Sequence, residues 1–189
     1  MGKIGELFQL LEKKDLYTAI HCKNVAIMTE QFSKVANMKS NEAKYLIDAA
    51  LLHDLGKLYI RDELLKSRNK LTDYQYDIIK EHCKIGYNIA KEYGLDTRIA
   101  EIILHHHENW NGQGYPNKIA GNEIPIGARI ISILDSIDAM CGIRYYKDSM
   151  YVSCCKNEII ASSGSKYDSN IVDFIIENWN NIVIQYDKL

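Results

Sequence analysis

The sequence predicts an all-α protein. Apolar residues recur every three to four positions along most of the 189 residues, and the strict alternation that is typical of a β-strand is scarce. Only two prolines, Pro116 and Pro125, interrupt the chain. Helical periodicity therefore dominates.

Each expected helix carries an apolar stripe, as Val25, Met28 and Phe32 do in the second one. Ser40 is the expected N-cap of the third helix, Thr72 with Asp73 caps the fourth, and Asp168 precedes the last. The long irregular stretch, residues 108–125, is where function tends to lie. We expect helices at residues 4–13, 16–36, 41–54, 73–93, 97–107, 126–141, 149–162 and 169–186.

The composition limits the classes of protein. A chain of 189 residues, 47% of them hydrophobic, predicts one compact domain with a sizeable core. No apolar run reaches the roughly 18 residues that span a bilayer, and the first residues lack the pattern of a signal peptide, so we expect a cytoplasmic protein. A net charge of -2 predicts no binding of long nucleic acid.

Five cysteines occur, and none belongs to a C-x-x-C pair. An odd number in a cytoplasmic protein indicates reduced thiols, and the adjacent pair near residue 155 is interpreted as incidental. The cysteines are Cys22, Cys83, Cys141, Cys154 and Cys155.

Histidines and aspartates interrupt the apolar stripes of five helices. A single histidine on such a stripe is usually a hydrogen-bonded core residue. The seven candidate ligands among these residues (all those named below except Asp138), however, would cost on the order of several kcal/mol if they were buried without a common partner. Imidazole and carboxylate are ordinary metal ligands, so we expect a metal cluster. The residues on the stripes are His21, His53, Asp54, His82, His106, His107, Asp135 and, one turn after Asp135, Asp138.

Seven ligands are too many for one tetrahedral ion, but they suit two ions that share a carboxylate. Two ions about 3.5–4 Å apart can clamp a phosphate and activate a bridging water. The pattern therefore points to hydrolysis of a phosphoester.

The motifs in these segments resemble those of the HD-GYP family, a branch of the HD superfamily of metal-dependent phosphohydrolases. The resemblance runs from about residue 17 to about residue 176. It implies an all-α HD-domain helical bundle of about seven to eight helices, with the additional GYP loop and C-terminal helices. We expect a short helical extension at residues 1–14 and a single domain at 15–189. The motifs are His53-Asp54 with Gly56-Lys57, His82 before Gly86, His106-His107-Glu108, Gly112-Gln113-Gly114-Tyr115-Pro116, Gly127-Ala128-Arg129-Ile130, Asp135 and Asp138-Ala139.

The resemblance also implies an activity. Members hydrolyse cyclic di-GMP to pGpG and, in some cases, to GMP, with a metal-bridging hydroxide as the nucleophile. The cofactors implied are two divalent metal ions, first iron or manganese, with zinc, nickel, cobalt or magnesium as alternatives. Diguanylate cyclases of the GGDEF type are implied as partners, and the sequence leaves the oligomeric state open.

Carried over by position, the family assigns roles to individual residues. His21, His53, Asp54 and Asp135 would hold the first metal, and His82, His106 and His107 the second, with Asp54 bridging. The catalytic set would be His53, Asp54 and Lys57. Cationic and aromatic side chains suit the cyclic dinucleotide, and the implied contacts are Lys57, Tyr115, Arg144 and Lys147.

The chain departs from the family pattern at four places. Tyr17 stands where some members place a glutamate for a third metal, so a two-metal site is expected. Tyr145 replaces the proline of the usual Arg-Pro-Tyr-Arg, and Asn109 and Asn111 replace the common arginine and aspartate. These changes put the rate in doubt rather than the reaction class.

Four further expectations concern neighbours of the site. Asp138 should orient a metal ligand, Arg129 should form a structural ion pair, and His105 should be exposed or peripheral. Because the loop at 109–121 is glycine-rich and has few apolar anchors, it should be mobile when empty.

Three functions remain open at this point. The first is a phosphodiesterase for cyclic di-GMP, and the second a phosphohydrolase for another nucleotide, such as a mixed cyclic dinucleotide. The third is a catalytically silent receptor or adaptor. Degenerate relatives typically lose metal ligands, and this chain keeps them, which favours an enzyme.

Overall fold

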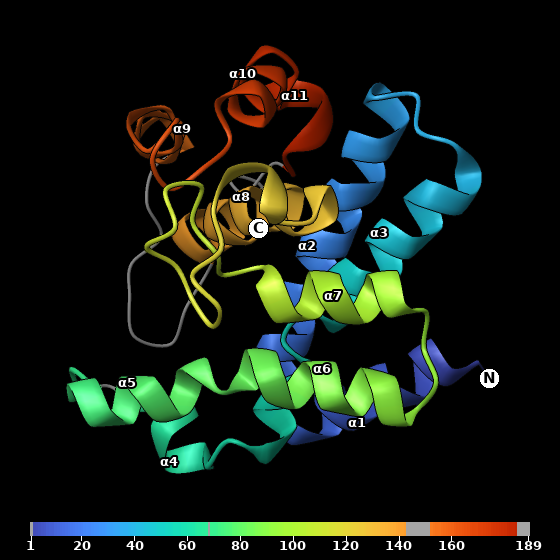
Figure 1. Ribbon diagram of the computed structural model, residues 1–189, viewed down its shortest axis with the longest axis vertical. Coiled ribbons are helices and arrows are strands. Elements are labelled where there is room, and N and C mark those ends of the chain that lie inside the picture. Colours follow the sequence, from blue (N-terminus) through green and yellow to red (C-terminus); the bar gives the residue numbers. More distant parts are fainter. Residues whose placement is uncertain (1, 68, 143–151, 185–189) are drawn as a thin grey trace.

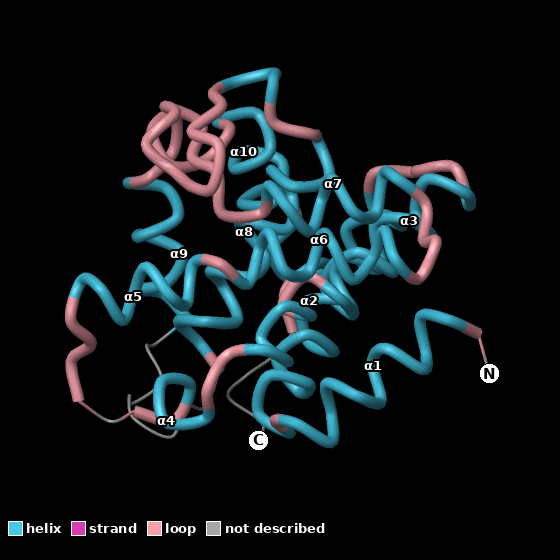
Figure 2. Tube along the Cα trace, turned by 60° about the horizontal axis from the view of Figure 1, so that its bottom comes forward, coloured by secondary structure: helices cyan, strands magenta, loops and turns pink. Residues whose placement is uncertain are grey.

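The computed structural model describes residues 2–67, 69–142 and 152–184, and this part of the chain is all-α, which confirms the predicted fold class (Figure 1). It contains no strand, as Figure 2 shows. The elements are α1 (Lys3–Lys14), α2 (Leu16–Val35), α3 (Ser40–Leu52), η1 (Leu55–Tyr59), α4 (Asp62–Leu65), α5 (Asp73–Lys80), α6 (His82–Glu92), α7 (Thr97–His105), η2 (Gly121–Glu123), α8 (Ile126–Cys141), α9 (Val152–Ala161), α10 (Ser169–Glu177) and α11 (Trp179–Ile182), where η marks a 3-10 helix.

Helix α2 organises the core, since it packs against α1, α3, α8 and α11 (Figure 1). Helix α7 contacts α3, α6 and α8, and α9 and α10 pack against each other and against α8. Apolar residues from most of these helices meet in one cluster. Its large, fully buried members include Leu7, Leu11, Met28, Leu52, Leu55, Ile103, Ile131, Ile133, Leu134, Ile137 and Ile159.

The helix expected at 73–93 is two helices, so that expectation was wrong in detail. At the junction, the Glu81 amide donates to the carbonyl of Ile78, three residues back, and the Nδ1 of His82 lies 2.7 Å from the carbonyl of Ile79. A side chain that donates a hydrogen bond to a backbone carbonyl competes with the backbone N–H four residues later, which would bond that carbonyl in a regular α-helix. The capping box at Thr72 and Gln75, before α5, confirms the predicted start.

The C-terminal helix expected at 169–186 is also divided. Helix α10 ends at Glu177, and the side-chain Nδ2 of Asn178 donates to the carbonyl of Phe174 at 2.9 Å. Asp168 caps α10 as predicted, accepting from the Asn170 amide, whereas Ser40 is the first residue of α3 and its N-cap is Lys39. The start predicted for the helix at 149–162 lies outside the described residues, which resume at Val152.

Helices α3 and α7 end earlier than expected, at Leu52 and His105. His53 and His106 are therefore the C-cap residues of these helices. Both predicted pairs of ligands, His53-Asp54 and His106-His107, lie just past a helix end, where the chain turns.

The short helix η1 docks directly on α6 because no side chain separates their backbones. A Cβ atom on Gly56 would overlap the carbonyl oxygen of His82 and would lie 2.8 Å from the backbone nitrogen of Gly86. This close approach brings Asp54, two residues before Gly56, to the start of α6. There its Oδ1 lies 3.4 Å from the Nε2 of His82.

We predict that Gly56→Ala destabilises the fold by about 3 kcal/mol, the upper end of the range for overpacked sites, since backbone atoms would have to move. Chemical denaturation measures the change in the free energy of unfolding. Gly2→Ala is the control, because nothing lies within 4 Å of a Cβ there; as Gly2 is the N-cap of α1 but makes no side-chain hydrogen bond, the change should cost less than about 1 kcal/mol. Equal stability of both variants would show that η1 and α6 can separate at little cost.

Candidate metal centre

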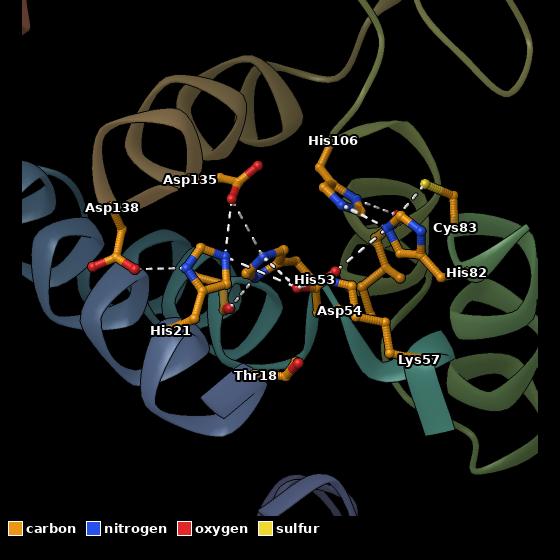
Figure 3. A network of polar contacts seen from close by, with 12 residues as sticks. Thr18, His21, His53, Asp54, Lys57, His82, Cys83, His106, Asp135 and Asp138 are labelled. Carbon is orange, nitrogen blue, oxygen red and sulfur yellow. Dashed lines mark hydrogen bonds and ion pairs between the residues drawn. The ribbon is translucent and has the colours of Figure 1, made fainter. Parts of the chain in front are cut away.

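The residues predicted as metal ligands come from five parts of the chain and meet in one buried place (Figure 3). Helix α2 contributes His21, the turn after α3 contributes His53 and Asp54, and α8 contributes Asp135. His82 begins α6, and His106 and His107 follow α7. The rings of neighbouring histidines lie edge to face or tilted, with centroids 4.1–5.3 Å apart.

Three of these histidines are fixed by the same hydrogen bond. The Nδ1 atoms of His53, His82 and His106 each lie 2.7 Å from the carbonyl oxygen of the residue three positions earlier. Because a carbonyl oxygen can only accept, each Nδ1 must carry the hydrogen. In the neutral ring the other nitrogen, Nε2, then has a free lone pair, and it faces the cluster.

The first group of ligand atoms comprises His21, His53 and Asp54, all within 4.8 Å of one another. Asp135 joins it, since its Oδ1 lies 2.9 Å from the Nε2 of His21 and 4.0 Å from that of His53. The Nε2 of His53 is buried and has no hydrogen-bond partner in the structure. A buried acceptor without a partner fits a cation at this point.

The second group comprises His82, Cys83, His106 and His107, again within 4.8 Å of one another. The Nε2 atoms of His82 and His106 face each other at 3.3 Å, although neither has a hydrogen to donate. Two nitrogens bound to one tetrahedral ion at about 2.0–2.1 Å lie roughly 3.3–3.4 Å apart. The donor set and its spacing therefore fit a divalent metal ion.

Asp54 stands between the two groups. Its Oδ1 faces His82, and its Oδ2 lies 3.6 Å from the Nε2 of His53 and 2.6 Å from the Nζ of Lys57. Burial would raise the pKa of the Asp54 carboxyl, but the ammonium of Lys57 and the nearby imidazoles outweigh it and hold this pKa well below its usual range. Asp54 is thus ionised and has oxygens on both sides.

His21 differs in charge from the other histidines of the cluster, because burial lowers the pKa of His53 in the first group as it does those of the second group. Burial would lower the pKa of His21, but the carboxylates of Asp135 and Asp138 outweigh it and raise this pKa to about 9. Burial, helped by the imidazole of His82, lowers the pKa of His107 to about 3. The pKa of His106 is held well below its usual range by burial and by neighbouring histidines. Neutral imidazoles, as in the second group, are the form that binds metals.

The loop after α7 is tied down at several points, so the premise that little holds it in place was wrong. Glu108 is buried, and its Oε1 accepts from the amides of Asn117 at 2.6 Å and Lys118 at 3.0 Å. The amides of Trp110 and Asn111 donate to carbonyls at residues 165–166. The Tyr115 amide donates to the carbonyl of His107 at 3.2 Å, and the two rings lie 4.9 Å apart between centroids.

Three predictions about neighbouring residues can be compared with the structure. Asp138 does contact a predicted ligand, since its Oδ2 lies 2.6 Å from the Nδ1 of His21. Arg129 forms the predicted ion pair, with Asp168 at 2.7 Å. His105 was expected to be exposed or peripheral: exposure is wrong, although the residue does lie outside both groups of candidate ligands. It is 7% exposed, because its Nδ1 donates to the carbonyl of Glu101 and its Nε2 contacts the Asn117 side chain of the loop.

The sequence interpretation missed Cys83 and the anchoring role of Glu108. A carboxylate directly after two candidate ligands, ahead of a glycine-rich loop, was a signal for the second. Arg144 and Lys147, the predicted cationic contacts of the substrate, lie outside the described residues, as does Tyr145. Among the described helices, none combines the length and apolar composition needed to cross a membrane.

The chain is similar to an HD domain family model and to two curated phosphodiesterases. A family model described as an HD domain matches residues 7–171. The chain is 31% identical to a 3'3'-cGAMP-specific phosphodiesterase 2 of Vibrio cholerae, over 95% of this chain and 35% of that protein. It is 33% identical to a cyclic di-GMP phosphodiesterase of Thermotoga maritima, over 96% of this chain and 50% of that protein. The chain therefore spans half or less of the length of these curated relatives.

A solved structure shows the same fold. An HDG"Y"P protein from Bdellovibrio bacteriovorus superposes with a TM-score of 0.70 at 16% identity, over 86% of this chain and 52% of that chain. At this identity the likeness concerns the fold alone.

We predict that Asp138→Asn weakens metal binding about 10–100-fold, the usual effect of removing a carboxylate that orients a ligating histidine. Asn offers a similar shape without the charge that holds the His21 ring. Competitive titration with a chelator measures the affinity. Asp77→Asn, an exposed carboxylate on α5 that pairs with Lys80, is the control and should bind metal as the wild type does. Unchanged affinity in Asp138→Asn would mean that packing alone orients His21.

Proposed function

Because the chain belongs to the HD domain family, in its HD-GYP branch, we propose that it is a metal-dependent phosphodiesterase that hydrolyses cyclic di-GMP to pGpG. One observation carries the proposal: the buried Nε2 acceptors of His53, His82 and His106 converge around an ionised Asp54. Burying such a set of acceptors and a carboxylate without a cation to bind them would cost free energy.

The donor atoms support two ions rather than three. His21, His53, Asp54 and Asp135 would hold one, and His82, His106 and His107 the other, with Asp54 shared. Tyr17 brings no carboxylate to the position that a third ion would need. Divalent ions held in this way supply a water of lowered pKa and a positive charge for the phosphoryl oxygens.

Lys57 contacts Asp54, and its position also suits a contact with the substrate. Its side chain is 24% exposed, whereas that of Asp54 is 3% exposed, so the Lys57 side chain reaches from the surface to the cluster. From there it would pair with a phosphoryl oxygen and stabilise negative charge as it develops. Arg144 and Lys147 would contact the cyclic dinucleotide, as the family pattern implies.

Tyr115 would provide a neutral hydroxyl beside the substrate. Burial raises the pKa of the Tyr115 phenol, so the group donates and accepts hydrogen bonds without ionising. Its ring packs against His107, which keeps the side chain next to the proposed second metal.

A second substrate is favoured by a specific finding. One of the relatives reported above is named as specific for 3'3'-cGAMP and another as acting on cyclic di-GMP. The proposed metal cluster would serve either substrate, since the phosphodiester is common to both and only the base contacts differ. A silent receptor is disfavoured because every proposed metal ligand is retained.

We predict that the metal-loaded protein hydrolyses cyclic di-GMP, and that 3'3'-cGAMP and cyclic di-AMP are turned over more slowly. Chromatography of the products, with metal counted per chain, makes the measurement. Asp54→Asn should lose both metal and activity. Lys57→Met should keep its metal and lose about 100-fold in kcat, the typical cost of one electrostatic contact in the transition state.

Lys84→Met is the control, since Lys84 is an exposed lysine on α6 and should not affect turnover. Two metals per chain without turnover of any cyclic dinucleotide would contradict the enzymatic function and leave a binding protein. Faster turnover of 3'3'-cGAMP would correct the substrate alone.

We also predict that Tyr115→Phe lowers kcat/KM for the preferred substrate about tenfold, because one hydrogen bond worth about 1–1.5 kcal/mol is lost. Steady-state kinetics measure the effect. Phe keeps the packing on His107, so an unchanged kcat/KM would show that Tyr115 shapes the loop and makes no hydrogen bond to the substrate.

A further inference from the structure

Cys83 lies inside the second group of candidate ligands, although no motif pointed to it. The residue directly follows His82 on α6, and its thiol is fully buried. Its Sγ lies 3.5 Å from the Nε2 of His82, and Figure 3 shows the sulfur close to this ring. One atom each from His82, Cys83, His106 and His107 lies within 4.8 Å of the others.

The ordinary interpretation of a buried cysteine is a small, inert apolar residue. Cys22 fits it, since Cys22 is equally buried on α2 but belongs to neither group of candidate ligands. Cys83 differs because its sulfur meets an imidazole nitrogen that has no hydrogen of its own. Either the thiol donates a weak hydrogen bond to His82, or sulfur and nitrogen share an ion.

We propose that Cys83 binds the second metal ion as a thiolate, and that it does so beside His82, His106, His107 and the shared carboxylate of Asp54. This inference rests on the proposed function, in that the cluster holds metal. The spacing supports it. A sulfur at about 2.3 Å and a nitrogen at about 2.05 Å from one tetrahedral ion lie roughly 3.5 Å apart. The distance from Cys83 to His82 is 3.5 Å.

Binding requires the thiol to lose its proton. Burial raises the pKa of the Cys83 thiol, so in the metal-free protein the group is a neutral thiol. When a divalent ion enters, the S–H bond breaks, the proton passes to solvent and the sulfur lone pair binds the ion, as in other thiolate sites.

A sulfur ligand would make the two metal positions unlike. Two histidines and two carboxylates, as in the first group, accept hard and borderline ions, whereas a thiolate favours zinc, cobalt or ferrous iron and disfavours magnesium. The second position should therefore reject magnesium even when it is in excess.

Cobalt(II) tests the inference without reference to activity, because a cobalt–thiolate bond gives a near-ultraviolet charge-transfer absorption. We expect this band in wild-type protein loaded with two cobalt ions per chain. Cys83→Ser should lose this band and bind the second cobalt ion at least tenfold more weakly. Tenfold is the smallest loss of metal affinity usual for replacing a residue that only orients a ligand, and loss of a ligand should cost at least as much. Cys22→Ser should keep both properties.

Three results would overturn the inference: two bound cobalt ions without the band, a band that persists in Cys83→Ser, or a band that Cys22→Ser removes. If no cobalt binds, the proposed function fails with it. X-ray absorption of the zinc-loaded wild type needs no variant. With two zinc ions per chain and one sulfur ligand, it should show on average half a sulfur neighbour per zinc at about 2.3 Å, and a shell of nitrogen and oxygen alone would contradict the proposal.

Discussion

Three buried histidines donate their Nδ1 hydrogens to backbone carbonyls three residues earlier, and the chemistry of the whole cluster depends on these hydrogen bonds. They leave the Nε2 atoms of His53, His82 and His106 as acceptors in a buried place. A buried polar group without a partner costs about 1–3 kcal/mol. A cation that satisfies several of them offsets that cost, and at a hundredfold excess over Kd it stabilises the fold by about 2.7 kcal/mol.

The same hydrogen bonds connect the site to the fold. His53 and His106 lie at the ends of α3 and α7, and His82 lies at the junction of α5 and α6. The ring of each histidine donates a hydrogen bond to a backbone carbonyl of the preceding helical turn, at the point where the regular backbone hydrogen bonds of that helix end. Gly56 then allows η1 to lie directly on α6, so that Asp54 reaches both groups of ligands. Site geometry and helix boundaries thus have one cause.

Much of the fold and of the cluster could be predicted, because both follow from periodicity. Polar side chains on apolar stripes must share a partner, and the structure does bring His21, His53 and His82 together with Asp54. Local competition for carbonyls could not be predicted. Periodicity continues through Glu81, where the helix divides, and it gives no sign that the loop carries Asn117 to cover His105.

Cys83 shows a different limit of the sequence. Cysteine ligands are usually recognised by their spacing from other cysteines, and Cys83 has no such neighbour. Its place beside His82 at the start of a helix brings it into the cluster, and this depends on how α6 packs against η1 and α7.

The most direct test of the account is anomalous diffraction from crystals of the metal-loaded protein. We expect two ions bound through the Nε2 atoms of His53, His82 and His106, while each Nδ1 keeps its hydrogen bond to the backbone carbonyl three residues earlier. Ions bound through Nδ1, or ions absent from this cluster in metal-loaded crystals, would contradict it.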